Sequence, residues 1–270
     1  MAISLTQKTN TIQIGDPRWL SFVSAQPEAT IFHHPAWSQL LAESYGYHPS
    51  ISVMERDGEI IAGLPLMDVE SRLTGRRKVA LPFSDFCPPL SRDIALLPKY
   101  IEALQEQQRA ENWTPLTVHW DLPRAEGVYP RETVARHVTT LTHDPEQLRR
   151  RFRSNVQRLI RQAEHASLTI RLSRTWVDVC AFYNLHLVTR RRQGTPIQPL
   201  RFFRLLWERI VGRGLGFVIL ANHDESARYI AGAVFLHWNK TLTYKYGASL
   251  PDALHLRPNN LIMWEALRWG

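Results

Sequence analysis

Apolar and polar positions repeat along the chain with two different periods. Residues 35–45 place their apolar side chains at the spacing of one helix face. Residues 51–55 and 59–69 are two extended apolar runs, and Asp57-Gly58 between them is typical of a tight hairpin turn. These patterns predict a helix followed by an antiparallel hairpin.

The same reasoning predicts the other elements of two halves. In the first half we expect helices at 17–24 and 95–112, strands at 76–81 and 116–120, and an irregular proline-rich segment at 82–90. In the second half we expect a helix that Asp144 caps and that continues to residue 166, helices at 176–192, 200–211 and from about 260, and strands at 168–172, 217–221, 229–238 and 241–249. Each half combines helices with a hairpin-rich sheet, which predicts a mixed α/β (α+β) fold.

Composition excludes several classes of protein. The chain has 270 residues, 44% of them apolar, which is enough for two cores and too many for a disordered chain. No apolar run approaches the roughly 20 residues of a membrane span, and the N-terminus lacks a signal-peptide pattern, so we expect a cytoplasmic protein. Cys87, Cys180 and the histidines show no metal-binding spacing, so no metal site is predicted.

Positive charge is concentrated in one segment. The net charge is +8, but residues 149–213 alone contain 15 arginines, no lysine and three acidic residues, a local charge of +12. The planar guanidinium fork binds phosphate in a bidentate way. The segment therefore favours a phosphate-rich partner, with Arg149, Arg150, Arg153 and Arg158 as candidate contacts. The alternative is a solvated helix face with no ligand.

A second candidate anion site lies near the end of the chain. A strand through Tyr246 is followed by a loop with Arg257, and then by Asn259-Asn260 opening a helix. This order lets the backbone N–H groups of a helix start point at an anion. The alternative is an Asn-capped helix whose Arg257 faces solvent. The glycine-rich run 212–216 has the opposite order, helix before strand, and is read as a helix termination.

Five segments of the chain resemble the FemAB-like branch of the GNAT acyltransferase superfamily. They are FHHPAWSQLLAESYGYHP (32–49), LPFSDFCPPL (81–90), RSNVQRLIRQAEHASLTI (153–170), FYNLHLVTRRRQGTPIQP (182–199), and YKYGAS with RPNNLIMWEALRW (244–269). The resemblance implies two tandem GNAT-like domains, 1–142 and 143–270, each with a mixed, mostly antiparallel sheet flanked by helices. In that family further strands follow the last helix, so we expect the second domain to be incomplete.

The resemblance also implies a reaction. Members of this branch form an amide bond on an amine acceptor, and some transfer an amino acid from aminoacyl-tRNA to a lipid-linked peptidoglycan precursor. Others use acetyl-CoA, whose pyrophosphate the superfamily holds in a glycine-rich loop. Arg257-Pro258-Asn259-Asn260 has no glycine, which disfavours acyl-CoA as the donor. An Arg-rich nucleic-acid-binding module on an inactive GNAT scaffold remains a third hypothesis.

The implied reaction assigns roles to particular residues. Lys245 is the candidate for electrostatic stabilisation, and Asp85 is the candidate that binds the incoming ammonium or accepts its proton. Candidate substrate-binding residues are Arg190, Arg191, Tyr246, Arg257, Asn259 and Asn260. Each of these residues could also have no role in the reaction. Lys245 could face outward from its strand, and arginines at the C-terminal end of a helix are favoured by the negative end of the helix dipole. We expect no resident cofactor, an amine-bearing and phosphate-containing acceptor, tRNA or acyl-CoA as the donor, and peripheral membrane contact as a further option.

Overall fold

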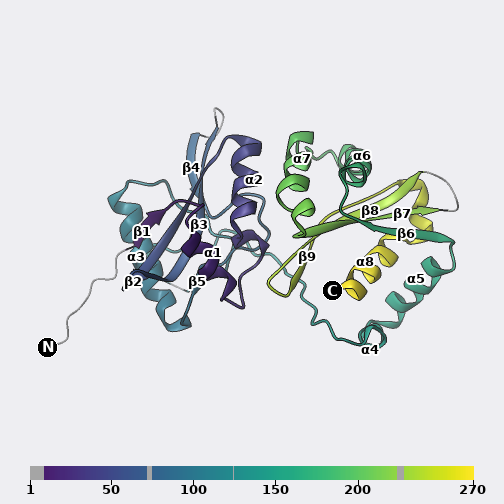
Figure 1. The fold of residues 1–270 in the computed structure, drawn as a ribbon, viewed down its shortest axis with the longest axis horizontal. Helices are drawn as coiled ribbons and strands as arrows, with labels where there is room; N and C mark the ends of the chain where they lie inside the picture. Colours follow the sequence, from purple (N-terminus) through teal and green to yellow (C-terminus); the bar gives the residue numbers. More distant parts are fainter. Residues whose placement is uncertain (1–8, 72–74, 124, 224–227) are drawn as a thin grey trace. The chain divides into compact units, whose positions relative to one another are not determined.

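The computed structural model describes residues 9–71, 75–123, 125–223 and 228–270. The chain divides into two compact units, Met1–Thr133 and Val134–Gly270 (Figure 1). The boundary expected from the sequence was at residue 142, within the start of the second unit. Each unit has its own sheet and its own helices, as the mixed α/β prediction requires.

In its described residues, the first unit is an antiparallel sheet with three α-helices. Its strands are β1 (Thr9–Ile12), β2 (His48–Arg56), β3 (Glu59–Ser71) and β4 (Gly75–Val79) in that order, and β5 (Leu90–Ser91) also pairs with β3. The helices are α1 (Pro17–Ser24), α2 (Pro35–Tyr45) and α3 (Leu97–Ala110). The hairpin between β2 and β3 turns at Asp57 (φ 53°) and Gly58 (φ 79°), the positive angles that this tight turn requires.

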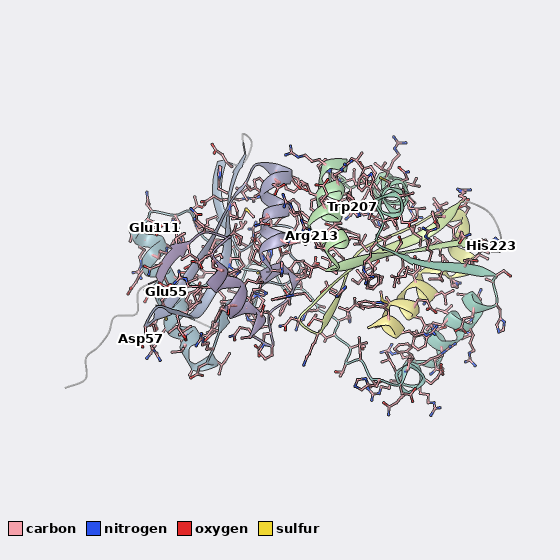
Figure 2. The ribbon with its side chains drawn as sticks, in the orientation of Figure 1. Glu55, Asp57, Glu111, Trp207, Arg213 and His223 are labelled. Atoms are coloured by element: carbon pink, nitrogen blue, oxygen red, sulfur yellow. The ribbon has the colours of Figure 1, made fainter. Side chains whose placement is uncertain are left out.

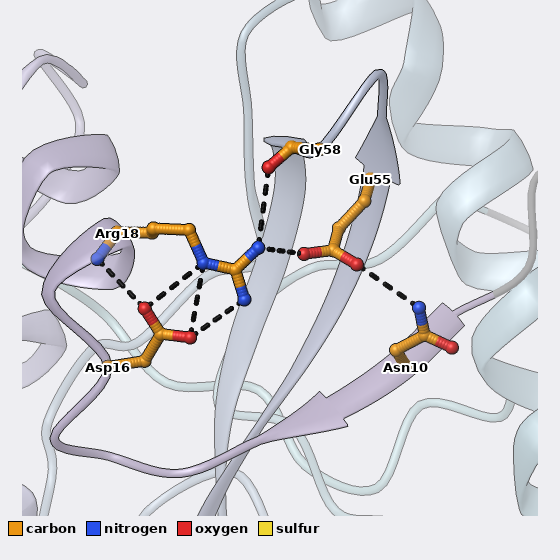
Figure 3. A network of polar contacts seen from close by, with 5 residues as sticks. All are labelled: Asn10, Asp16, Arg18, Glu55 and Gly58. Carbon is orange, nitrogen blue, oxygen red and sulfur yellow. Dashed lines mark hydrogen bonds and ion pairs between the residues drawn. The ribbon is translucent and has the colours of Figure 1, made fainter.

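A polar network fastens α1 to this hairpin (Figure 3). The carboxylate of Asp16 caps α1 at the amide of Arg18 (2.9 Å) and also binds its guanidinium (2.7 Å). The same guanidinium donates to Glu55 (2.6 Å) and to the carbonyl of Gly58 (3.3 Å), and Asn10 donates to Glu55 (3.1 Å). The hydrogen bond from Arg18 lowers the pKa of Asp16. Helix, turn and edge strand are thereby held in one arrangement.

One predicted strand of the first unit is wrong. Within residues 116–120 only Thr117 pairs, in an isolated parallel bridge to Val79. The alternating Leu116 and Val118 are instead partly buried against the core under α3. Apolar alternation in this segment reflects packing, and it does not form a hydrogen-bonded ladder.

The second unit is a four-stranded antiparallel sheet between two layers of helices. The strands are β6 (Leu168–Ser173), β7 (Gly216–His223), β8 (Tyr229–Trp238) and β9 (Thr241–Ser249), in that order. Figure 1 shows α6 (Trp176–Arg192) and α7 (Leu200–Arg209) on one face, and α8 (Pro258–Trp269) with α5 (Ser154–Glu164) on the other. The β8–β9 turn has positive φ at Asn239 (49°) and Lys240 (59°), as expected for a tight hairpin.

The predicted long helix up to residue 166 is two helices. Asp144 caps α4 (Pro145–Arg150) as expected, by accepting from the amide of Glu146 at 2.9 Å, but the helix ends there and α5 begins at Ser154. The break turns Phe152 inward, where its ring meets Trp264 of α8 edge-on with centroids 5.9 Å apart. In the described part of the chain, no helix is long and apolar enough to cross a bilayer.

The glycine-rich run 212–216 ends a helix, as predicted. A short 3₁₀ turn, Val211–Arg213, follows α7, and Gly214 closes it in the left-handed conformation (φ 77°). Figure 2 labels Trp207 and Arg213, which border an open hollow at this end of α7.

Candidate active site

A bulge in β9 lies at the centre of the candidate site. Tyr246 faces Val234 of β8, and Tyr244 faces the next residue, Phe235, so Lys245 between them has no partner in the ladder. A bulge inserts one extra residue, bends the strand and changes the direction of the side chains around it. Lys245 is that extra residue, which the sequence pattern did not indicate.

The bulge directs the two tyrosines into different surroundings. Tyr246 is buried among aromatic rings of α6 and α7, with centroids 5.5 Å from His186 and 5.8 Å from Phe203. Tyr244 packs on Phe235 (5.5 Å) and lies over Gly247, where the hydroxyl leaves no room for a Cβ. Burial raises the pKa of Tyr244.

Lys245 is half-buried beside these rings. Its ammonium Nζ lies 5.4 Å from the centre of the Tyr246 ring, within the range of a cation–π contact. The structure therefore places a cation with three N–H donors at the strand irregularity. The candidate electrostatic role of Lys245 stays a prediction, but the alternative of an ordinary outward-facing strand lysine does not describe this position.

His186 is a site residue that the sequence analysis missed. It is buried on α6, and Nε of Arg190 donates to its Nε2 at 3.4 Å, which leaves the ring proton on Nδ1. Burial lowers its pKa to about 4, and the charge of Arg190 adds to this effect. Gln198 and the backbone of Gly247 act in the opposite direction and raise the pKa of His186. Neither makes a hydrogen bond of normal geometry to Nδ1 of His186. The sequence feature that could have identified His186 is its position on α6, one helical turn before Arg190.

Helix α6 also holds the end of β9. The hydroxyl of Thr189 accepts from the amide of Ser249 (3.2 Å) and lies 3.4 Å from its carbonyl oxygen. On the other side, Nδ2 of Asn259 donates to the Ser249 hydroxyl (3.3 Å). These contacts fix the position of the last strand residue between α6 and α8. They also show what Asn259, a candidate substrate contact, does in the protein itself.

The start of α8 departs from the Asn-capped alternative. Its N-cap residue is Arg257, and in the described residues no side chain caps the helix. Arg257 is exposed and has φ 59° immediately before Pro258, a position where proline disfavours helical angles. A non-glycine residue in this conformation is strained and is held by its surroundings. Asn260 is partly buried, and its amide donates to the carbonyl of Arg257 (3.1 Å).

The four predicted phosphate contacts do not share one environment. Arg149 forms two hydrogen bonds with Glu164 (2.8 and 2.7 Å) and lies 5.4 Å from the ring centre of Trp264, so it links α4, α5 and α8. The hydrogen bonds to Glu164 raise the pKa of Arg149. Arg158 is exposed and donates to Asn155 (2.9 Å). Arg150, Arg153 and the candidate Arg191 are also exposed.

Asp85 is exposed on a loop of the first unit that buried side chains anchor. Nε1 of Trp37 donates to the hydroxyl of Ser84 (2.8 Å), and His119 donates to its carbonyl (3.1 Å). Two residues of the loop, Leu81 (φ 51°) and Phe83 (φ 58°), have the left-handed backbone conformation. A strained, well-anchored loop of this kind is frequent at binding sites.

His33 also anchors this loop, through a hydrogen bond to its backbone. The amide of Thr30 donates to Nδ1 (3.0 Å), so Nε2 carries the proton and donates to the carbonyl of Pro88 (2.9 Å). Burial lowers the pKa of His33 to about 4 and raises that of the neighbouring Cys87 thiol. Burial therefore disfavours the Cys87 thiolate, the form that acts as a nucleophile. Asp85 belongs to the first unit and Lys245 to the second, and each is positioned by its own unit.

Comparison with known proteins identifies the second unit. Residues 150–270 match the family model of the acetyltransferase (GNAT) domain. No curated protein matches the sequence. The chain is therefore an acyltransferase with a GNAT domain in its second half.

Solved structures extend the likeness to both units. The crystal structure of FemX aligns over 96% of this chain and 85% of its own, with a TM-score of 0.70 and 13% identity. A tandem GNAT protein of the clavulanic acid biosynthesis pathway aligns over 97% of this chain and 85% of its own, with a TM-score of 0.48 and 13% identity. The likeness to FemX shows the fold, and it confirms the FemAB-like tandem arrangement expected from the sequence.

Proposed function

We propose that this chain, an acyltransferase of the GNAT superfamily, joins an amino acid carried by tRNA to an amine of a phosphate-bearing cell-envelope precursor. The observation that carries the proposal is the bulge at Lys245. It sets a half-buried ammonium beside the end of a strand that Thr189 and Asn259 hold in place.

The reaction needs three things of the protein. A neutral amine must lie about 3 Å from the acyl carbonyl, the developing oxyanion needs a donor, and the amine must lose a proton. The C–N bond forms, the ester C–O bond to the tRNA breaks, and the proton leaves the amine and ends on the released ribose hydroxyl. In the proposal Lys245 donates to the oxyanion, a contribution on the order of 3 kcal/mol.

Asp85 would act on the acceptor. An exposed carboxylate on a rigid loop can bind an ammonium and accept its proton before attack. The anchors at Trp37 and His33 keep this loop in one conformation, so little entropy is lost when the acceptor binds. This role assigns acceptor binding to the first unit and acyl-group activation to the second.

The start of α8 favours tRNA over acyl-CoA as the donor. A pyrophosphate cradle uses the first amides of a helix. Here Pro258 occupies the first helical position and has no N–H, and the amide of Asn260 is bonded to the carbonyl of Arg257. Exposed Arg257 and Arg191 remain available as phosphate contacts.

A donor assay tests the proposal. The protein is incubated with a nucleotide- or lipid-linked peptidoglycan precursor and either radiolabelled acetyl-CoA or tRNA charged with a labelled amino acid. We expect the label from charged tRNA on the precursor and none from acetyl-CoA. Transfer from acetyl-CoA alone would contradict the choice of donor, and transfer from neither would contradict the proposed acceptor.

Asp85 has its own test in the same assay. Asp85→Asn keeps the size of the side chain and removes its charge, so we expect the KM for the acceptor to rise and kcat to fall. Asp57→Asn, in the β2–β3 turn of the same unit, is the matched control and should leave both constants unchanged. Equal kinetics of the two variants would remove Asp85 from the mechanism.

A further inference from the structure

Helix α6 has apolar residues on its exposed face as well as its buried one. The exposed fractions are 74% for Val177, 39% for Leu187 and 44% for Val188, and Leu200 at the start of α7 is 47% exposed. Apolar side chains that gather on an exposed face mark a candidate interaction surface. We call these four residues the α6–α7 patch.

Contacts between α6 and α7 show that Leu187 and Leu200 lie at the same end of the two helices. The helices pack side by side, with Trp176 against Trp207 (5.9 Å) and Tyr183 against Phe203 (5.1 Å). Because Tyr183 meets Phe203 and the helices are antiparallel, Leu187, one turn later, lies at the same end as Leu200. The loop 193–199 joins the helices there.

The surroundings of the patch are strongly basic. Arg191, Arg192 and Arg201 are exposed at the same end of the two helices. The three acidic residues of segment 149–213 are all engaged by arginines: Glu164 by Arg149 (2.7 Å), Asp178 by Arg171 (3.0 Å) and Glu208 by Arg204 (3.0 Å). Asp178 is in addition buried. No carboxylate of this segment offsets the arginines around the patch.

We propose that the α6–α7 patch binds the surface of a membrane that contains anionic phospholipids. Aliphatic side chains enter the headgroup boundary, and arginines with long aliphatic stems reach the lipid phosphates. The proposal concerns where the protein resides, and it holds whatever acyl group is transferred.

Charge and side-chain type distinguish this occupant from others. A symmetric dimer would bring Arg191, Arg192 and Arg201 of two copies together, and like charges disfavour that. RNA offers no partner for Val177, Val188 and Leu187, because bases stack on aromatic rings. A protein interface is usually rich in aromatic residues, which this patch lacks.

Vesicle co-sedimentation tests the proposal. The full chain is mixed with vesicles of phosphatidylcholine alone or of phosphatidylcholine with phosphatidylglycerol. We expect binding only to the anionic vesicles, and weaker binding as salt increases. Equal binding to both vesicles, or binding to neither, would overturn the proposal, as would capture by an acidic protein without any vesicle binding.

Two sets of variants assign the effect to the patch. Leu187→Glu with Val188→Glu should weaken vesicle binding by more than about tenfold. Arg192→Ala and Arg201→Ala should each weaken it about fivefold, and they leave the apolar residues intact. The controls are Ile94→Glu, an 80% exposed residue of the first unit, and Arg109→Ala, an exposed arginine on α3 of the same unit. If the control variants lose as much vesicle binding as the patch variants, the assignment is contradicted. If the double glutamate variant does not fold, the two arginine variants provide the test.

Discussion

At the scale of single residues, the two buried histidines are the groups whose protonation matters most. Burial lowers the pKa of both His33 and His186 from 6.5 to about 4. Their rings are therefore neutral in the folded protein and protonated in the unfolded chain between these two values. His33 fixes the loop that carries Asp85, and His186 lies against Tyr246 beside Lys245.

This difference predicts a loss of stability on acidification. Because the unfolded state binds more protons between pH 6.5 and about 4, the free energy of unfolding should fall as the pH falls through this range. His33, which is fully buried, contributes about 3 kcal/mol to the loss. Urea unfolding of the wild type and of His33→Gln, across this pH range, measures it. An equal slope in the two proteins would contradict the role of His33.

Gly63 permits a close approach that no other residue allows. A Cβ there would lie 2.8 Å from the Trp19 ring and 3.1 Å from the carbonyl of Ser52. We expect Gly63→Ala to lower the free energy of unfolding by about 1–3 kcal/mol. Gly15→Ala, where nothing lies within 4 Å, is the control for urea unfolding. If both variants are equally stable, the packing around Trp19 is looser than described.

At the scale of elements, local signals in the sequence predicted most of the fold. The hairpin turn predicted at Asp57-Gly58 has the positive φ angles that these two residue types tolerate. The helices with strong periodicity and a clear end, such as α2 before Gly46, have the predicted bounds. These features depend on neighbouring residues only, so a single sequence contains the information.

Features that depend on distant residues were not predictable. The bulge at Lys245 is a shift in the register between β8 and β9. It depends on the pairing of two strands, and no pattern within β9 alone reveals it. The break between α4 and α5 places Phe152 against Trp264, more than a hundred positions away, and no local pattern reveals that contact. The site residues Lys245 and Arg257 were chosen from local motifs, while His186 becomes visible only when α6 is packed against β9.

The helix break separates two roles for arginines. Arg149 links α4 to α5, so Arg149→Ala should lower the free energy of unfolding by about 1 kcal/mol. Exposed Arg150 makes no such link in the described contacts, and Arg150→Ala should change stability by less than about 0.5 kcal/mol. Thermal unfolding measures both, and equal melting temperatures would show that the Glu164 pair is not stabilising.

The same residues test tRNA binding. Replacing an exposed arginine that contacts phosphate should reduce the salt slope of tRNA affinity by about one. We expect this of Arg150→Ala, Arg153→Ala and Arg158→Ala, and not of Arg149→Ala, whose guanidinium is bound to Glu164. Unchanged slopes for the three exposed arginines would place tRNA elsewhere or exclude it.

At the scale of the whole molecule, the proposed reaction divides its chemistry between the two units. The first presents a carboxylate on an anchored loop, and the second presents a cation at a strand bulge within a GNAT domain. Neither unit supplies both groups in the proposed reaction. The proposed division of roles predicts that a substitution in either unit impairs transfer while leaving the other unit folded.

The most direct measurement compares Lys245→Met with Lys240→Asn in single-turnover transfer from charged tRNA to the precursor. Both variants lose one positive charge from the β8–β9 hairpin, but only Lys245 occupies the bulge beside Tyr246. We predict that Lys245→Met slows the transfer step by about a hundredfold, as expected for the loss of one oxyanion donor, while Lys240→Asn transfers at the wild-type rate. Equal rates for Lys245→Met and the wild type would contradict the account.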